Sequence, residues 1–167
     1  MPSLPALLLA LVAIGPRPTP LFQAARVPCR VSRVIDGDTF TCTGGRRVRL
    51  LSIDAPESRQ GAAGDSATAA LQRLIHDGDQ VTLELGRDSL DRYGRTLAFA
   101  FRSDSLLINE ELVRRGWAVV YFYDRKNPQY GDRLTAAELS ARKARRGWWR
   151  DGPIGCRPSA FRHRECR

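Results

Sequence analysis

Short runs of strand-forming residues alternate with tight turn signals in the first hundred residues. This alternation limits the possible fold classes more than any other feature of the sequence. Asp36-Gly37 and Gly44-Gly45 are typical hairpin turns, and residues 91–94 form a third turn signal. The strands are expected in residues 27–43 (two strands), 46–53, 80–85 and 96–101. Five short strands joined in this way favour a small antiparallel barrel of the OB type.

Helical periodicity appears between and after these strands. The expected helices run from a cap at Asp65 or Ser66 to a stop near Gly78, from a cap at Asn109 to Gly116, and from Gly131 to about Arg145. The sequence therefore predicts an α+β fold, a five-stranded antiparallel OB-type barrel with about three helices. No periodicity is visible from Trp148 onward, where only a disulfide would order the chain.

The chain is expected to have three parts. Leu4 to Ile14 is an apolar run with the length of a secretion-signal core and is too short to span a bilayer. Residues 1–25 are therefore expected to be a signal peptide, with an uncleaved N-terminal anchor as the alternative. A folded domain at 27–148 and a basic, Cys-containing tail at 149–167 would follow. This organisation predicts a secreted or periplasmic protein.

The four cysteines lack the Cys-x-x-Cys spacing of zinc or redox sites. Three disulfide pairings are possible. We expect Cys29–Cys42 and Cys156–Cys166, because each of these pairs is close in sequence and closes a short loop. Disulfides persist in oxidising compartments, so this pairing agrees with export. Four buried thiols in a cytosolic protein are the alternative.

The charge of the chain is strongly positive and unevenly distributed. The net charge is +9, and 25 of the 27 basic residues are Arg. Residues 125–167 contain 12 basic and four acidic residues. Guanidinium groups bind phosphate through paired hydrogen bonds, so this composition favours a nucleic-acid partner. Genomic base composition would also favour Arg, and the basic tail could simply be a solvated surface.

Four acidic residues of the first half lie at strand ends. Asp36 and Asp38 flank the first hairpin turn, and Asp54 and Glu57 follow the third strand. If the second and third strands are neighbours, Asp38 and Asp54 can converge at one end of the sheet. Two carboxylates with a backbone carbonyl suit Ca²⁺ or Mg²⁺. Asp-Gly-Asp is also a common turn sequence, so this pattern alone does not establish a metal site.

Arg49 lies in a strand whose two sides are both mostly apolar. A guanidinium that is poorly hydrated needs an anionic partner, either a substrate phosphate or a carboxylate such as Asp54 or Glu57. Together with Arg95, it completes a set of carboxylates and arginines. Phosphodiester hydrolysis needs such a set: a metal and cations to stabilise the developing charge, and a carboxylate to activate water.

The order of these residues resembles the staphylococcal nuclease (thermonuclease) family. The matching segments are residues 34–39, 49–57, 91–95 and 108–116, and the resemblance covers about residues 30–148. It implies an OB-type barrel with three helices. It also implies Ca²⁺-dependent cleavage of DNA and RNA with low sequence specificity, leaving 3′-phosphate ends.

The resemblance also implies roles for individual residues. Asp38, Asp54 and the backbone carbonyl of Ala55 would bind calcium, and Glu57 would be the general base or would orient the water. Arg49 and Arg95 would hold the phosphate. The residues expected to hold the nucleotide are Arg92, Tyr93, Tyr121 and Tyr123, although core packing is an alternative for the tyrosines. The Lys-rich loop of the family is shortened here to residues 58–64, and the C-terminal arm could compensate for that loss.

Two other functions compete with the nuclease. A non-catalytic OB-fold module that binds single-stranded nucleic acid would explain the predicted barrel. A basic protein that is cross-linked by disulfides and binds polyanions would explain the charge and the cysteines. The joint presence of Asp38, Arg49, Asp54, Glu57 and Arg95 favours the enzyme. We expect a monomer that acts on DNA and RNA, without a membrane partner unless the N-terminal segment is retained.

Overall fold

The computed structural model describes residues 26–123 and 129–166. The expected signal or anchor at residues 1–25 lies outside the described residues and stays a prediction. Within the described ranges, the longest helices are too short or too polar to cross a membrane.

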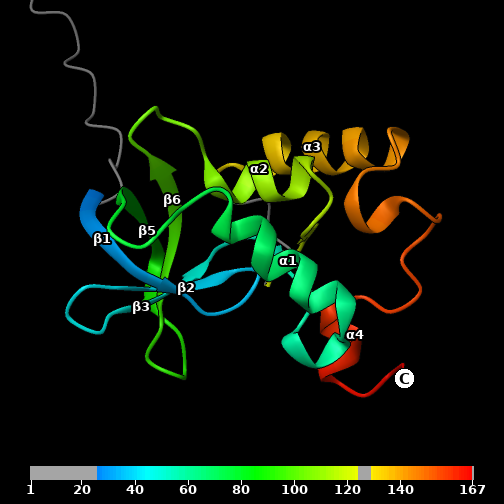
Figure 1. Cartoon of the computed structure of the whole chain (residues 1–167), viewed down its shortest axis with the longest axis horizontal. Helices are drawn as coiled ribbons and strands as arrows, with labels where there is room; N and C mark the ends of the chain where they lie inside the picture. The colour runs from blue at the N-terminus through cyan, green and yellow to red at the C-terminus, as the bar shows by residue number, and fades with distance from the viewer. Residues whose placement is uncertain (1–25, 124–128, 167) are drawn as a thin grey trace, which may run out of the picture.

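A closed five-stranded barrel forms one side of the molecule (Figure 1). Its strands follow the order β1-β2-β3-β6-β5 around the barrel. They are β1 (Arg26–Val34), β2 (Thr39–Cys42), β3 (Arg47–Leu50), β5 (Gln80–Leu90) and β6 (Thr96–Arg102). The expected OB-type barrel and α+β class are therefore confirmed.

The expectation of a purely antiparallel barrel was wrong at one seam. Four neighbouring pairs are antiparallel, but β3 and β6 are parallel, with Arg49 opposite Leu97. The reason is geometric: directions cannot alternate around a closed ring with an odd number of strands. One of the five seams must therefore be parallel, and here it is the seam that carries Arg49.

The third expected strand ends earlier than predicted because the backbone turns sharply after Leu50. Ser52 has a φ of 61°, and the chain then continues as the two-residue strand β4 (Ile53–Asp54). β4 leaves the barrel and pairs with β7 (Val119–Val120). This break places Asp54 outside the barrel wall, next to the segment that contains Tyr121.

Three main helices accompany the barrel, as expected. They are α1 (Ala62–Gln72), α2 (Ile108–Arg114) and α3 (Gly131–Lys143), and α2 and α3 lie side by side along the top of Figure 1, to the right of β6. The predicted ends of α1 were wrong: Asp65 lies in its first turn, and the helix stops at Gln72, well before Gly78. Gly78 instead makes a turn with a φ of 92° and donates its N–H to the Val31 carbonyl oxygen.

Asn109 is not a helix cap, because Leu107 occupies that position and Asn109 lies inside α2. Its fully buried side chain accepts a hydrogen bond from the Ala100 N–H (3.0 Å) and donates one to the Leu51 carbonyl oxygen (2.9 Å). Asn109 therefore fastens α2 to β6 and to the end of β3. It satisfies backbone groups at the parallel seam that no strand neighbour reaches.

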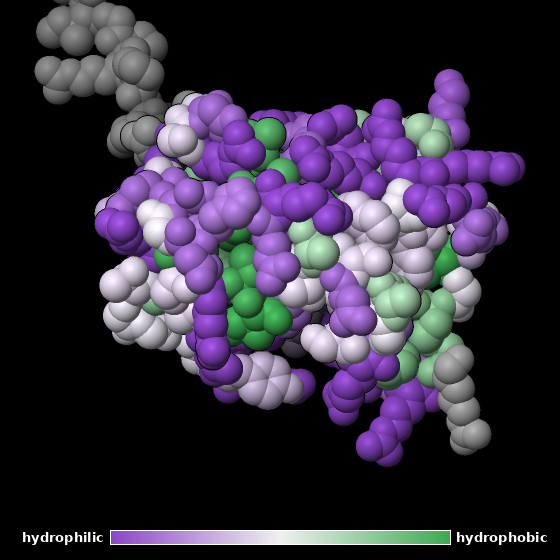
Figure 2. Space-filling view, in the orientation of Figure 1, coloured by the Kyte–Doolittle hydropathy of each residue, from purple (hydrophilic) through white to green (hydrophobic). Residues whose placement is uncertain are grey.

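One hydrophobic core fills the barrel and continues under the helices. Phe40, Val48 and Leu83 are buried inside the barrel, and Leu71 of α1 and Leu112 of α2 extend the same cluster. Hydrophilic side chains cover most of the face drawn in Figure 2. The interior of the barrel is thus apolar.

Both expected disulfides are present. Cys29–Cys42 joins β1 to β2 within the barrel wall. Cys156–Cys166 closes a loop that contains the short helix α4 (Pro158–Arg162), after the single-turn segment Gly147–Trp149. The tail was expected to lack periodicity and to be ordered by this disulfide, and the short helix α4 lies within the loop that the disulfide closes. A five-residue helix has too few turns to leave a periodic sequence pattern.

Replacing Asn109 by Ala tests the seam. The substitution leaves the Ala100 N–H and the Leu51 carbonyl buried without this partner, and each such group costs about 1–3 kcal/mol. We expect Asn109→Ala to lower the free energy of unfolding by about 2–4 kcal/mol in urea titrations. Gln72→Ala, an exposed amide at the end of α1, is the control and should change it by less than about 0.5 kcal/mol. Equal effects of the two variants would contradict this role.

Candidate active site

The β2–β3 hairpin brings the first carboxylate beside an arginine. Thr39 lies opposite Arg49, and the Leu50 N–H donates to the Asp38 carbonyl oxygen (2.9 Å). Asp38 is buried at the start of β2, and its Oδ1 lies 3.0 Å from the Arg49 Nε. The expected neighbourhood of the second and third strands is therefore present, and it aims Arg49 at Asp38.

Arg49 also reaches the second carboxylate. Its Nη2 donates to Asp54 Oδ1 (3.0 Å), while Nη1 donates to the carbonyl oxygens of Leu50 (2.6 Å) and Ile53 (3.0 Å). The Arg49 side chain is only 13% exposed, and that of Asp54 is fully buried. A single guanidinium thus bridges Asp38 and Asp54. This arrangement contains the ion pair with Asp54 that sequence reasoning left open as an alternative.

The loop after β4 closes around Asp38. The Ala55 N–H donates to Asp38 Oδ2 (2.8 Å), so the residue after Asp54 lies against the other carboxylate. Gly37 permits this approach, because a Cβ there would lie 2.7 Å from the Ala55 Cβ and 2.6 Å from the Ala67 Cβ. Glycine at position 37 therefore lets α1 and the Asp54–Ala55 loop pack against the hairpin turn.

Burial shifts the titration of two carboxyl groups here. Burial, followed by repulsion from Asp38, raises the pKa of Asp36 to about 6, although the Asp38 N–H and Arg49 act in the opposite direction. Burial also raises the pKa of Asp54, against the lowering effect of Arg162 and Arg49. Asp36, Asp38 and Asp54 thus lie close together at one rim of the barrel, and neighbouring carboxyl groups are expected to favour a bound cation.

The donor set fits a hard divalent ion. Asp38 and Asp54 offer carboxylate oxygens within reach of one guanidinium, and Ca²⁺ prefers such oxygen ligands. No cluster of three or more His, Cys, Asp or Glu side chains suited to a metal occurs in residues 26–123 and 129–166. An ion at this rim would therefore need a backbone carbonyl, such as that of Ala55, and water as further ligands.

Glu57 lies at the edge of the same cluster, just before the single-turn segment Ser58–Gln60. Its N–H donates to Gln60 Oε1 (2.9 Å), and its carboxylate is 30% exposed. α1 passes so close to the Glu57 backbone that a Cβ at Gly64 would lie 2.2 Å from the Glu57 carbonyl oxygen. The backbone of Glu57 is thus held in place, while its carboxylate stays accessible to water.

Arg162 of α4 also enters this cluster, and sequence reasoning missed it. Its Nη1 and Nη2 donate to Asp54 Oδ1 (2.8 Å) and Oδ2 (3.0 Å), and Nη1 also donates to Glu57 Oε1 (2.8 Å). The contacts join residues more than one hundred positions apart in the chain. The only signal for them is that Arg162 lies between two cysteines expected to pair.

Arg95 is placed differently from Arg49. It precedes β6 on the same side of the barrel as Leu97, which is the neighbour of Arg49. Among the described residues it bonds to Asp91, through Nε to Oδ2 (2.7 Å), and to neither Asp38 nor Asp54. Burial would raise the pKa of Asp91, but hydrogen bonds from Arg95 and Tyr93 lower it overall. Arg95 is thus held by Asp91 in the β5–β6 turn.

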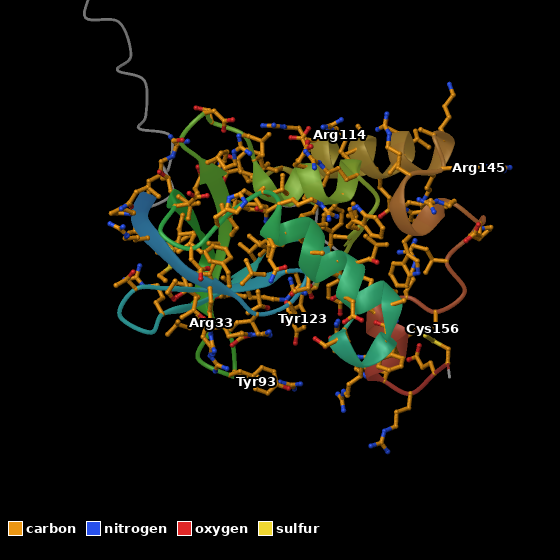
Figure 3. All side chains as sticks on the ribbon, in the orientation of Figure 1. Arg33, Tyr93, Arg114, Tyr123, Arg145 and Cys156 are labelled. Carbon is orange, nitrogen blue, oxygen red and sulfur yellow. A yellow bond between two sulfur atoms is a disulfide. The ribbon has the colours of Figure 1, made fainter. Side chains whose placement is uncertain are left out.

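The four residues expected to hold the nucleotide fall into two groups. Arg92 and Tyr93 lie in the β5–β6 turn, where the guanidinium carbon of Arg92 lies 4.8 Å from the centre of the exposed Tyr93 ring. Figure 3 shows Tyr93 at the lower edge of the barrel. Tyr121 is half-buried and donates its N–H to the Ser52 carbonyl oxygen (3.0 Å). Tyr123 is 91% exposed, so core packing does not explain it.

Asp36→Asn gives a pH test of the crowded rim. The pKa of Asp36 is about 6 in the folded protein, whereas its ordinary value in an unfolded chain is 3.8. Protonated Asp36 therefore stabilises the fold below about pH 4, and this contribution is lost as the pH rises through about 6. In chelator, wild type should lose about 1–2 kcal/mol more unfolding free energy than Asp36→Asn between pH 4 and 7. Parallel pH profiles from urea titrations would contradict the burial of Asp36.

Comparison with known proteins shows the family to which this chain belongs. A profile of the family described as Staphylococcal nuclease homologue matches residues 47–151. An uncharacterized endonuclease of Haemophilus influenzae is 38% identical over 141 residues, covering 82% of this chain and 74% of the relative. The thermonuclease of Staphylococcus hyicus is 32% identical over 128 residues, covering 72% of this chain and 74% of the relative.

A further relative is much longer than this chain. Endonuclease YhcR of Bacillus subtilis is 31% identical over 151 residues, which cover 81% of this chain but 12% of YhcR. The profile match includes Arg49, Asp54 and Glu57, and it ends before the Cys156–Cys166 loop. With the barrel and the Arg49–carboxylate cluster, these matches show that the chain belongs to the staphylococcal nuclease homologue family.

Proposed function

We propose that this chain is an exported, calcium-dependent nuclease that hydrolyses DNA and RNA with low sequence specificity and leaves 3′-phosphate ends. The observation that carries the proposal is the bridge of Arg49 between Asp38 and Asp54, with Glu57 beside it. A nuclease needs cationic groups at the phosphate and a carboxylate for the water, and these residues supply both.

Asp38, Asp54 and the Ala55 carbonyl would hold the ion. When bound, calcium would supply positive charge that stabilises the growing negative charge on the phosphate oxygens. Ser52 and the β4–β7 pairing hold Asp54 outside the barrel wall, and Asp38 directly precedes β2. The two ligands thus come from separate segments that the hairpin and the Arg49 bridge bring together.

Glu57 and the arginines would perform the remaining steps. The partly exposed Glu57 carboxylate accepts a proton from a water molecule as that water attacks phosphorus. Arg49 and Arg95 donate hydrogen bonds to the phosphate oxygens, and the bond from phosphorus to the 5′ oxygen breaks. The phosphate stays on the 3′ side, and the 5′ oxygen takes a proton from solvent water and leaves as a hydroxyl, while the proton on Glu57 returns to solvent.

The surroundings of the rim suit an extended polyanion. Arg92 and Tyr93 form a guanidinium–aromatic pair beside Arg95, and Tyr123 exposes its ring to solvent. Aromatic faces stack on bases without reading sequence, and guanidinium groups bind phosphates. These contacts support low specificity for the substrate. The two disulfides support an oxidising location, as expected for an exported protein.

The direct test is digestion of plasmid DNA and of RNA with and without chelator. Wild type should cleave both with calcium, lose cleavage in EDTA and regain it when calcium is added back. Glu57→Gln should lower kcat about 10²–10⁴-fold, the usual contribution of a general base. Glu110→Gln, the same change on α2 where Glu110 pairs with Arg133, should keep full activity.

Cleavage that continues in EDTA, or a fully active Glu57→Gln variant, would overturn the proposed function. A protein that binds single strands but never cuts them would instead be the non-catalytic module. The ends of the products provide a separate check: 3′-phosphate ends block polymerase extension until a phosphatase removes them.

Arg49→Lys tests the bridging guanidinium. Lysine keeps the charge but loses the planar fork that reaches Asp38 and Asp54 together, so the pocket loses its geometry. We expect kcat to fall about 10²–10³-fold, as when one transition-state donor is removed. Arg73→Lys, an exposed residue just after α1, is the matched control and should keep its rate. Equal rates for the two variants would contradict the role of Arg49.

A further inference from the structure

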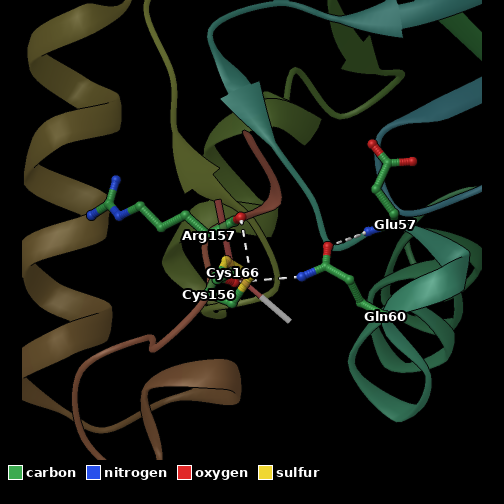
Figure 4. Close-up of a disulfide and its surroundings, with 5 residues drawn as sticks. All are labelled: Glu57, Gln60, Cys156, Arg157 and Cys166. Atoms are coloured by element: carbon green, nitrogen blue, oxygen red, sulfur yellow. Dashed lines mark hydrogen bonds between the residues drawn. A yellow bond between two sulfur atoms is a disulfide. The ribbon is translucent and has the colours of Figure 1, made fainter. Parts of the chain in front are cut away.

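The Cys156–Cys166 loop lies against the candidate active site through several contacts. Gln60 Nε2 donates to the Cys156 carbonyl oxygen (3.4 Å), and the Gln60 Oε1 accepts from the Glu57 N–H (Figure 4). Arg157 Nη2 lies 3.5 Å from Glu138 Oε1 of α3. The loop is therefore tied both to the segment that holds Glu57 and to the helix layer.

Arg162 is the side chain through which this loop reaches the cluster. A carboxylate offers about two acceptor directions on each oxygen. On Asp54, Arg49 and Arg162 together fill Oδ1, and Arg162 takes a direction on Oδ2. Removing Arg162 would free one acceptor direction on each Asp54 oxygen and would leave the Arg49 bond to Oδ1 in place.

A divalent ion and Arg162 compete for the same two Asp54 oxygens. Calcium needs oxygen ligands at about 2.3–2.6 Å, and the Arg162 nitrogens already lie 2.8 and 3.0 Å from these oxygens. While Arg162 is docked, only one acceptor direction on Oδ2 is open, and two cations this close repel each other strongly. Calcium binding to Asp54 is therefore favoured when Arg162 moves away.

Arg162 is better placed to leave than Arg49. Two backbone carbonyl oxygens hold the Arg49 Nη1, and its side chain is 13% exposed. The Arg162 side chain is 35% exposed, and its guanidinium bonds are to Asp54 and Glu57. The long side chain can swing into solvent while the disulfide keeps the loop in place.

We propose that Arg162 is a positioning residue that competes with calcium for Asp54 and Glu57, and that the Cys156–Cys166 disulfide holds it there. This inference rests on the proposed calcium site. In the metal-free protein, Arg162 neutralises the buried Asp54 and orients Glu57. Closing the short loop reduces the conformational entropy lost when Arg162 docks, so the disulfide favours the docked state. The loop thereby sets the calcium affinity of the site.

Calcium titration by calorimetry tests the competition without any substrate. The apparent dissociation constant rises as the fraction of competent protein falls, so a side chain docked about nine-tenths of the time weakens binding about tenfold. Arg162→Gln should therefore bind calcium about tenfold more tightly than Arg164→Gln. Arg164 is the matched control, because it lies exposed in the same loop and the substitution removes the same charge.

A second variant tests whether the Cys156–Cys166 disulfide holds Arg162 at the site. Cys156→Ser/Cys166→Ser opens this loop and leaves Cys29–Cys42 intact, which a reductant would not. It should also tighten calcium binding, and adding Arg162→Gln to it should give no more than the affinity of Arg162→Gln alone. An unchanged affinity in the double-Ser variant would contradict the role of the disulfide.

Thermal unfolding in chelator tests docking independently of calcium. Arg162→Gln leaves Asp54 buried with one cation fewer, so it should unfold at a lower temperature than Arg164→Gln. Calcium should raise the midpoint of Arg162→Gln by more than it raises that of wild type, because the ion replaces the lost charge.

The outcomes separate the two proposals. If wild type binds calcium and the Arg162 and Arg164 variants bind it equally, the role of Arg162 is wrong and the proposed calcium site stands. If Arg162→Gln binds calcium more weakly than Arg164→Gln, Arg162 supports the ion and competition is again wrong. If no variant binds calcium, the metal role of the pocket itself is wrong and both proposals fall.

Discussion

Two buried carboxyl groups that lie side by side can both stay ionised only when a cation compensates them, and the rim of this barrel depends on that constraint. Arg49 supplies the cation by bridging Asp38 and Asp54, and Leu50 and Ile53 fix its other nitrogen by their carbonyl oxygens. The bridge brings together a hairpin turn and a strand that has left the barrel. It therefore organises both the local fold and the chemistry proposed for it.

The barrel makes this bridge possible through its parallel seam. Because an odd number of strands closes the ring, one seam must be parallel; here it joins β3 to β6, and the break at Ser52 then lets β4 leave the wall. Asn109 satisfies backbone groups at that seam from α2. The disulfide-closed C-terminal loop supplies Arg162 from the opposite side, so the pocket draws on both ends of the described chain.

The parts that sequence could predict are those encoded by local chemistry. Turn residues such as Asp36-Gly37 and the alternation in the strands predict the hairpins, and adjacent hairpin strands bring Asp38 and Arg49 together. The parallel seam was missed because strand direction depends on how the barrel closes. Asn109 resembles a cap because caps and buried clamps use the same polar side chains. Arg162 was missed because its contacts depend on the tertiary fold alone.

A structure of the protein crystallised with calcium would show whether Asp38 and Asp54 share one ion. We expect one ion within about 2.3–2.6 Å of oxygens from both residues, with Arg49 still bridging them and Arg162 withdrawn from Asp54. An ion bound elsewhere, or an ion at this rim with Arg162 still bonded to both Asp54 oxygens, would contradict this expectation.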